Sequence, residues 1–263
     1  MISPHQSIFF MIFLACQITI FVTISIVILW FHTTKQQRGK KMTYDYIIIG
    51  SGFGGSVSAL RLAEKGYKVA VIEMGKHLTS NDFEHGCKSM RHFIWNPLLG
   101  FKGYFFQEIF KHLAIIGGVG VGGGSNVYGA VLLEPKDEFY SDSAWNYFGI
   151  DWKDELAEHY KTASRMLGIE TNPNMGIQDE YLKQTAKKMG AESTFGPVPS
   201  GIYFGNPEEI QNDPYFKGEG PSRVGCHLCG KCMTGCPHGS KNTLDKNYLY
   251  FAQKHGAEII ADR

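Results

Sequence analysis

A glycine-rich turn directly after a short apolar run most constrains how this chain can fold. The apolar run Tyr46–Ile49 is typical of a strand buried on both faces. Ser56–Lys65 then carries apolar residues at helical spacing, and Lys68–Ile72 is a second apolar run of strand length. Between the first strand and the helix, a G-x-G-x-x-G pattern is formed by Gly50, Gly52 and Gly55. This order of elements predicts a Rossmann-like α/β domain that binds a dinucleotide.

Each part of this unit has a predicted role. The first glycine permits the tight turn, the second lets the backbone approach a pyrophosphate, and the third lets helix and strand pack closely. The helix N-terminus offers N–H groups to phosphates, and Gly66 is suited to end the helix. Glu73, after the second strand, is placed to accept hydrogen bonds from ribose hydroxyls, which disfavours NADP. The pattern alone leaves FAD and NAD open.

A second glycine-rich loop, GGVGVGGGSNVYGAVLLEP, spans Gly117–Pro135. A backbone so bare of side chains can lie flat against a planar ring or a pyrophosphate. Its flanks are apolar at Leu113–Ile116 and Val131–Leu133, and these flanks predict a loop that is buried and rigid.

Together these motifs resemble a known family. The first glycine turn, Glu73, the GVGGGS loop, WKDELAEHYKTASRMLGI and HGSKNTLDKNYL are similar to the glucose–methanol–choline (GMC) oxidoreductases, most of all to the cholesterol-oxidase-like bacterial branch. The resemblance runs from about Tyr44 to the end of the chain. It implies a glutathione-reductase-type FAD-binding domain, a partial substrate domain of antiparallel sheet, and oxidation of an alcohol carbon by hydride transfer to FAD.

The resemblance also implies which residues bind the cofactor. It assigns Glu73 to the ribose, and it places Tyr128 and Gly129 beside the isoalloxazine ring. The resemblance implies a sterol or another hydrophobic alcohol as the substrate. Members that oxidise sterols often have Asn where this chain has Tyr128, a departure that speaks against a sterol. The pyrophosphate turn comprises Gly50, Ser51, Gly52, Phe53, Gly54 and Gly55, and the loop under pyrophosphate and flavin comprises Gly122, Gly123, Gly124 and Ser125.

No catalytic residue is predicted in this chain. An alcohol that gives up a hydride must also lose a proton. In the family, the base is a histidine of the C-terminal half, and none of the ten histidines here matches it. His238, in PHGSKN, corresponds to a structural or flavin-side segment. We therefore expect an N-terminal FAD-binding fragment with little turnover alone, or one that works with a separately encoded C-terminal half.

Four cysteines lie within eleven residues, at Cys226, Cys229, Cys232 and Cys236, and match the iron–sulfur spacing C-x2-C-x2-C-x3-C-P. In ferredoxins with two clusters, the fourth cysteine of such a run serves the other cluster, which leaves Cys87 as the remaining candidate ligand. Zinc favours two separated C-x2-C knuckles, and these overlap. Plain thiols, an iron–sulfur centre that exports electrons to a membrane carrier, and zinc all stay open.

Residues 8–31 form 24 positions without a charged residue, long enough to span a bilayer as a single transmembrane helix. The flank after this run carries Lys35, Arg38, Lys40 and Lys41, which predicts a catalytic domain on the cytoplasmic side. The alternative is that translation starts at Met42, which would make a cytoplasmic protein without an anchor.

The net charge of +1 gives no indication of a nucleic-acid partner. The predicted organisation is a membrane segment with its basic flank (1–41), a first part of the FAD-binding domain (42–138), a partial substrate region (139–220), and a cysteine-rich loop that returns to the FAD-binding domain (221–263). In the third region, a helical face is expected from Leu156, Tyr160, Ala163 and Leu167.

Overall fold

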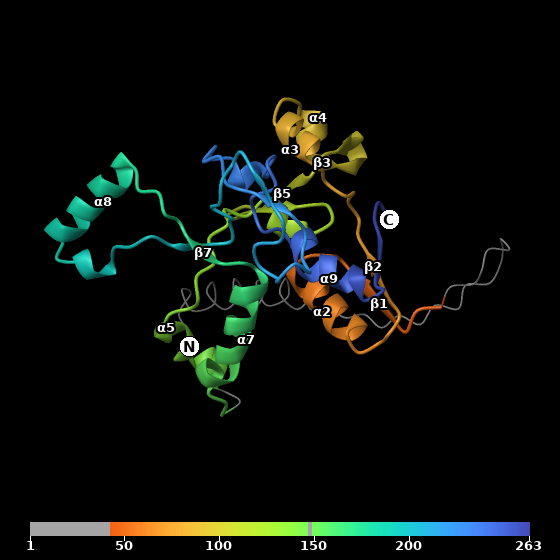
Figure 1. Ribbon diagram of the computed structural model, residues 1–263, viewed down its shortest axis with the longest axis horizontal. Helices are drawn as coiled ribbons and strands as arrows, with labels where there is room; N and C mark the ends of the chain where they lie inside the picture. Colours follow the sequence, from red (N-terminus) through yellow and green to blue (C-terminus); the bar gives the residue numbers. More distant parts are fainter. Residues whose placement is uncertain (1–42, 147–148) are drawn as a thin grey trace. The chain divides into compact units, whose positions relative to one another are not determined.

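The computed structural model describes residues 43–146 and 149–263, so the predicted membrane span at residues 8–31 lies outside it. Among the described residues, no helix is both long enough and apolar enough to cross a bilayer. The described chain forms two units. The first comprises residues 43–78, 88–124 and 248–263, and the second comprises residues 79–87 and 125–247 apart from 147–148 (Figure 1).

A parallel sheet of three strands forms the core of the first unit. Its order is β1 (Tyr46–Ile49), β2 (Val69–Ile72) and β11 (Glu258–Ile260), with β2 in the centre. Val69, Ala70 and Val71 are all buried, as expected for a central strand with both faces covered. The α/β fold and the predicted strand bounds are therefore confirmed, β2 to within one residue.

Helix α2 (Phe53–Ala63) connects β1 to β2 and begins three residues before its predicted start. The glycines of its first turn are poor helix formers, but they occupy a turn whose N–H groups lack intrahelical partners in any case. The helix ends at Ala63, two residues before the predicted Lys65. The chain then turns at a left-handed Gly66 (φ +84°), whose N–H donates to the carbonyl of Ala63 at 2.9 Å. Helix α9 (Tyr248–Lys254) packs alongside α2 (Figure 1).

The rest of the first unit lies between β2 and α9 in the sequence. Its elements are α4 (Met90–Phe93), β3 (Trp95–Asn96), η1 (Pro97–Leu99), β4 (Phe101–Lys102), the hairpin of β5 (Phe105–Ile109) and β6 (Ala114–Gly118), and the start of η2 (Gly123–Asn126). The second glycine loop leaves β6 and is buried at Val119 and Val121.

The predicted burial of this loop is confirmed at Val119 and Val121, but its apolar flanks are not buried with it. Leu113 and Ile116 on one side are 56% and 58% exposed, and Leu133 on the other side is 65% exposed. The physical reason on the first side is the hairpin itself. In the described residues, β5 and β6 pair with each other and, apart from an isolated bridge between Phe105 and Ile94, with no other strand. Alternate side chains of the ribbon therefore point away from the protein.

The second unit has short elements and long irregular connections. Helix α7 (Trp152–Met166) has the predicted face, since Leu167 is buried and Leu156, Tyr160 and Ala163 are half-buried. Asp151 caps its N-terminus. The other elements are α3 (Ser80–Gly86), α5 (Asp137–Tyr140), α6 (Ser143–Asn146), β7 (Glu170–Thr171), α8 (Ile177–Lys188), η3 (Glu192–Thr194), β8 (Pro199–Ser200), β9 (Ile210–Gln211), β10 (Arg223–Val224), η4 (Cys232–Thr234) and η5 (Leu244–Lys246).

Substituting Gly55→Ala should destabilise the fold. A Cβ atom at this position would lie 2.0 Å from the carbonyl oxygen of Gly50 and 3.2 Å from Cγ2 of Ile48, so backbone would have to move. We expect the free energy of unfolding to fall by about 1–3 kcal/mol or more. Thermal melting followed by circular dichroism measures this change. Gly196→Ala is the control, because its Cβ would meet nothing within 4 Å. Equal melting temperatures for the two variants would contradict the prediction.

Candidate functional site

The first glycine turn has the geometry of a phosphate-binding loop. Gly50 has φ +88°, a left-handed conformation that favours glycine, and this lets the chain reverse directly after β1. Gly55 packs so closely on the Gly50 carbonyl that a side chain is excluded. These two glycines therefore have the structural roles predicted for the first and third positions of the pattern.

The space beside Gly52 suits a pyrophosphate. Gly52 is the N-cap of α2, and no side chain caps this helix end. A Cβ atom built on Gly50 or Gly52 would meet nothing within 4 Å. The positive end of the helix dipole therefore lies beside open space at Gly50 and Gly52, an arrangement that favours bound phosphate. The residues present fit a dinucleotide such as FAD.

Ser51 joins this turn to Glu73. Its backbone N–H and its hydroxyl donate hydrogen bonds to Oε2 of Glu73 at 3.0 and 2.7 Å. The other carboxylate oxygen, Oε1, accepts from the N–H of Gly75 at 3.0 Å. Ser51 is fully buried and Glu73 is 4% exposed. Glu73 was predicted to bind a ribose, and the structure shows that it also fixes the first glycine turn.

The second glycine loop packs directly against the first. The N–H of Gly122 donates to the hydroxyl of Ser51 at 3.0 Å. A Cβ atom on Gly123, which has φ +51°, would lie 2.9 Å from Cα of Gly52. The two loops, recognised as separate motifs in the sequence, therefore form one glycine-lined surface in the first unit.

Sequence reasoning missed the segment after Glu73. A Cβ atom on Gly75 would lie 2.4 Å from the backbone nitrogen of Gly120. The carbonyl of Lys76 accepts from the N–H of Val121 at 3.0 Å. The signal in the sequence is Gly75 itself, a glycine two residues beyond the carboxylate. Gly75 allows the second loop to lie against the end of β2.

The end of the second loop belongs to the second unit. Ser125 is fully buried, and its hydroxyl accepts from the N–H of Leu244 at 3.1 Å. The phenol of Tyr128 is surrounded by protein, and this burial raises its pKa above the usual range. Gly129 has room for a side chain, since its Cβ would lie 3.8 Å from Cγ of Met233.

Lys241 is a functional candidate that sequence reasoning left without a role. Its ammonium group donates to the carbonyls of Asn126, Tyr128 and Cys232 at 2.8, 3.0 and 2.7 Å, and it lies 4.9 Å from the ring centre of Tyr128. Lys241 is 1% exposed. Burial lowers the pKa of this ammonium to about 8, against the opposing effect of Cys232 and Cys236. Lys241 thus fastens the cysteine-rich loop to the end of the second glycine loop.

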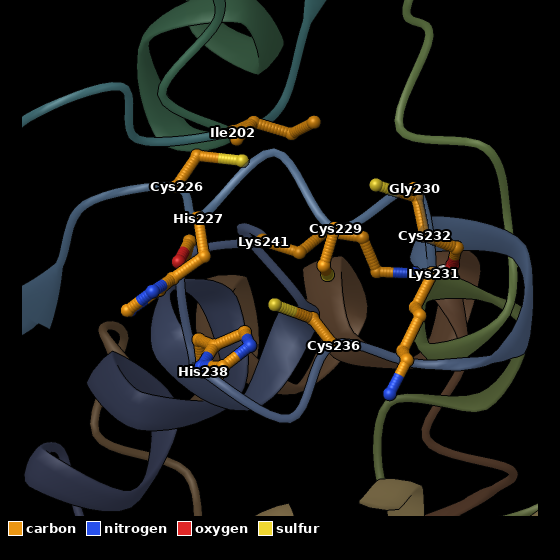
Figure 2. A pocket seen from close by; sticks show the side chains of 11 residues that line it. Ile202, Cys226, His227, Cys229, Gly230, Lys231, Cys232, Cys236, His238 and Lys241 are labelled. Carbon is orange, nitrogen blue, oxygen red and sulfur yellow. Dashed lines mark hydrogen bonds between the residues drawn. The ribbon is translucent and has the colours of Figure 1, made fainter. Parts of the chain in front are cut away.

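The cysteines of the predicted run share one pocket in the second unit (Figure 2). Burial raises the pKa of both Cys226 and Cys232. His227 and His238 also line the pocket, with stacked rings whose centres are 3.9 Å apart. The pocket is lined by all four cysteines of the run, Cys226, Cys229, Cys232 and Cys236. The exposed Cys87, considered above as a fourth ligand, is not part of the lining.

Comparison with known proteins agrees with this geometry. The family of NAD(P)-binding Rossmann-like domains matches residues 48–92. A cholesterol oxidase from Acinetobacter baumannii is 48% identical over 224 residues, which is 83% of this chain and 40% of that protein. A long-chain-alcohol oxidase from Arabidopsis thaliana is 28% identical over 234 residues, 86% of this chain and 26% of that protein. A GMC-type oxidoreductase from Mycobacterium tuberculosis is 26% identical over 229 residues, 82% of this chain and 31% of that protein.

The chain is a homologue of the FAD-binding part of GMC oxidoreductases. It spans about 40% of the length of the cholesterol oxidases that it matches. The predicted resemblance to this family and to its cholesterol-oxidase-like branch is confirmed, and so is the Rossmann-like fold. FAD as the cofactor agrees with these relatives, and the oxidoreductase activity stays a proposal. The individual cofactor-binding residues stay predictions.

Substituting Gly52→Ala should weaken FAD binding without harming the fold. The backbone of Gly52 has φ −68°, which alanine adopts freely, and the added methyl group would meet no protein atom within 4 Å. It would instead occupy the space assigned to the pyrophosphate. We expect an unchanged melting temperature and a Kd for FAD at least about tenfold higher, measured by flavin fluorescence quenching. Affinity equal to that of the unmodified chain would contradict the assignment.

Substituting Glu73→Gln should also weaken FAD binding, because it removes a charged acceptor from Ser51 and from the ribose. Hydrogen bonds to charged groups contribute about 1.5–3 kcal/mol, so the Kd for FAD should rise about tenfold or more. Equilibrium titration with FAD measures this. The control is Glu64→Gln, an exposed position that pairs with Arg61. A Kd unaffected by the first substitution, or raised equally by both, would refute the role of Glu73.

Proposed function

We propose that this chain is the FAD-binding part of an oxidoreductase that oxidises the CH–OH group of a sterol or another hydrophobic alcohol. The observation that carries the proposal is the surface formed by two glycine loops that meet at Ser51 and Glu73. This surface combines an open helix N-terminus with a buried carboxylate, the two features that recognise the pyrophosphate and the ribose of a dinucleotide.

The chain's residues divide the work of holding the cofactor. In our proposal, Glu73 accepts hydrogen bonds from the ribose, and Tyr128 and Gly129 lie beside the isoalloxazine ring. We also propose that the FAD-binding domain has the glutathione-reductase-type arrangement. The pyrophosphate is held by Gly50, Ser51, Gly52, Phe53, Gly54 and Gly55, and the loop beneath pyrophosphate and flavin is formed by Gly122, Gly123, Gly124 and Ser125.

When bound, FAD supplies a hydride acceptor. The residues of this chain position the cofactor and keep water from the buried carboxylate. Lys241 holds the carbonyls of Asn126 and Tyr128, which fixes the backbone at the end of the second loop. We assign the proton-accepting base to no residue of this chain.

The names of the relatives support a hydrophobic substrate. The relatives include cholesterol oxidases and long-chain-alcohol oxidases, and both names denote enzymes that act on water-insoluble alcohols. An N-terminal anchor at residues 8–31, with the catalytic domain on the cytoplasmic side, would bring the enzyme to such substrates.

We further propose that the catalytic site is completed by a part that corresponds to the portion of the cholesterol oxidases that this chain does not match. The first unit offers a surface for added structure. β1 lies at one edge of the described sheet, and its Ile47 and Ile49 are 40% and 64% exposed. An open strand edge can pair with a further strand, and exposed apolar side chains on that strand can be covered by a further segment.

Anaerobic flavin reduction tests the proposed activity. The chain is loaded with FAD and mixed with cholesterol or a long-chain primary alcohol, with and without a polypeptide that supplies the portion of the cholesterol oxidases that this chain does not match. We expect bleaching of the flavin absorbance only when that polypeptide is present, and no bleaching with glucose.

Each other outcome contradicts one part of the proposal. Absence of bleaching with every hydrophobic alcohol, although FAD is bound and the polypeptide that supplies the unmatched portion is present, would overturn the substrate class. Rapid bleaching by the chain alone would overturn the need for a second half.

A further inference from the structure

The cysteine-rich loop of the second unit is built on a rigid base. The hydroxyl of Ser240, after the loop, donates to the carbonyl of Gly225, before it, at 2.9 Å. Gly225 itself packs tightly, because a Cβ atom there would lie 1.8 Å from the carbonyl oxygen of Gly205. Both ends of the segment that holds the cysteines are thus fixed.

The turn between the last two cysteines is fixed as well. Gly235 has φ +102°, and its Cβ would lie 2.0 Å from the ring of Phe83, a buried residue of α3. Only glycine permits this contact, and the contact turns Cys236 back toward the pocket that Cys226, Cys229 and Cys232 line (Figure 2). The position of the fourth cysteine therefore follows from the packing of the turn.

The first cysteine pair forms a knuckle with a backbone donor aimed at sulfur. The N–H of Leu228 donates to Sγ of Cys226 at 3.4 Å. Leu228 adopts φ +54°, an unfavourable conformation for a leucine, and Gly230 after the second cysteine has φ +71°. Backbone strain of this kind persists where the surroundings require it. An N–H directed at a cysteine sulfur stabilises the thiolate form that ligates metals.

The buried ammonium group of Lys241, beside the pocket, would be stabilised by a nearby anion. The ammonium of Lys241 is buried, and its hydrogen-bond partners are three neutral carbonyls. Among the described residues, no carboxylate forms an ion pair with it. Burying a charge without a partner is costly. Figure 2 shows the side chain of Lys241 among the four cysteines, where metal-bound thiolates would supply the missing negative charge.

The sequence spacing of the four cysteines favours a cluster over a single zinc ion, because it is that of a ferredoxin run and its C-x2-C knuckles overlap. Within residues 43–146 and 149–263, no three Cys, His, Asp or Glu side chains form a group that could hold a metal ion as they stand. A zinc ion needs its sulfur ligands about 2.3 Å away, which draws four of them close together. A cluster of several irons and sulfides occupies the centre itself and takes thiolates that are further apart.

We propose that Cys226, Cys229, Cys232 and Cys236 together ligate one iron–sulfur cluster of the [4Fe–4S] type, with Lys241 as the buried counter-charge. Spacing alone left the fourth ligand open, and the pocket supplies it as Cys236. Each thiol loses its proton to solvent as its sulfur binds iron, and the iron and sulfide come from outside the chain. The proposal does not depend on FAD being bound.

Metal and sulfide analysis tests the proposal. The chain is purified without oxygen, and iron, zinc and acid-labile sulfide are measured per chain. We expect about four irons and four sulfides for a cluster of this type. Cys229→Ser should lose most of the iron and sulfide. Cys87→Ser, the control at an exposed cysteine outside the pocket, should lose none.

Reconstitution keeps the test decisive if the serine variant fails to fold. The unmodified chain, freed of metal, is incubated anaerobically with ferrous and ferric iron in equal amounts and with sulfide, which matches the two ferrous and two ferric ions of a resting [4Fe–4S] cluster. Electron paramagnetic resonance is recorded after reduction with dithionite. A cluster signal with matching iron and sulfide supports the proposal. Folded protein that takes up neither, or that contains about one zinc per chain instead, overturns it.

Discussion

The buried hydrogen bonds of Ser51 are the interaction on which the first unit depends. Its hydroxyl donates to Glu73 and accepts from Gly122, so one side chain joins the end of β2 to both glycine loops. Since the acceptor is a buried carboxylate, each such bond contributes about 1.5–3 kcal/mol, and loss of one partner would leave a charge without its donor. Glycines on both loops let the backbones approach closely enough for these bonds to form. The hydrogen bonds of Ser51 therefore hold the two glycine loops together and also shape the proposed cofactor site.

Local pattern predicted much of this arrangement. Strand β1 has its predicted bounds, because a short apolar run followed by glycines has few alternatives. Helix α2 begins at Phe53 and not at the predicted Ser56, because the spacing of apolar residues gives no signal for a glycine-rich first turn. The contact between Gly122 and Ser51 joins residues 71 apart in sequence and has no local pattern. The exposed Leu113 and Ile116 show a further limit of prediction from sequence, since apolar residues alone do not reveal whether other parts of the protein cover a hairpin.

The cysteine-rich loop shows a similar limit. Spacing identified three good ligands, but only the packing of Gly235 on Phe83 explains why Cys236 lines the same pocket. Lysine is almost never fully buried, so nothing in the sequence indicated that Lys241 lies beneath this loop. Its three carbonyl partners come from the loop and from the end of the second glycine loop, residues 115, 113 and 9 positions away. The resemblance to a family identified the segment that contains Lys241 as a motif, whereas the structure shows that Lys241 holds three backbone carbonyls.

The central claim is that two glycine loops and one buried carboxylate form a site for FAD. Parallel calorimetric titrations of the purified chain with FAD and with NADP⁺ test it most directly. The account predicts saturation by FAD at one molecule per chain and no measurable heat from NADP⁺, because Glu73 would face the 2′-phosphate of that dinucleotide. Absence of FAD binding by the folded chain, or tighter binding of NADP⁺ than of FAD, would contradict it.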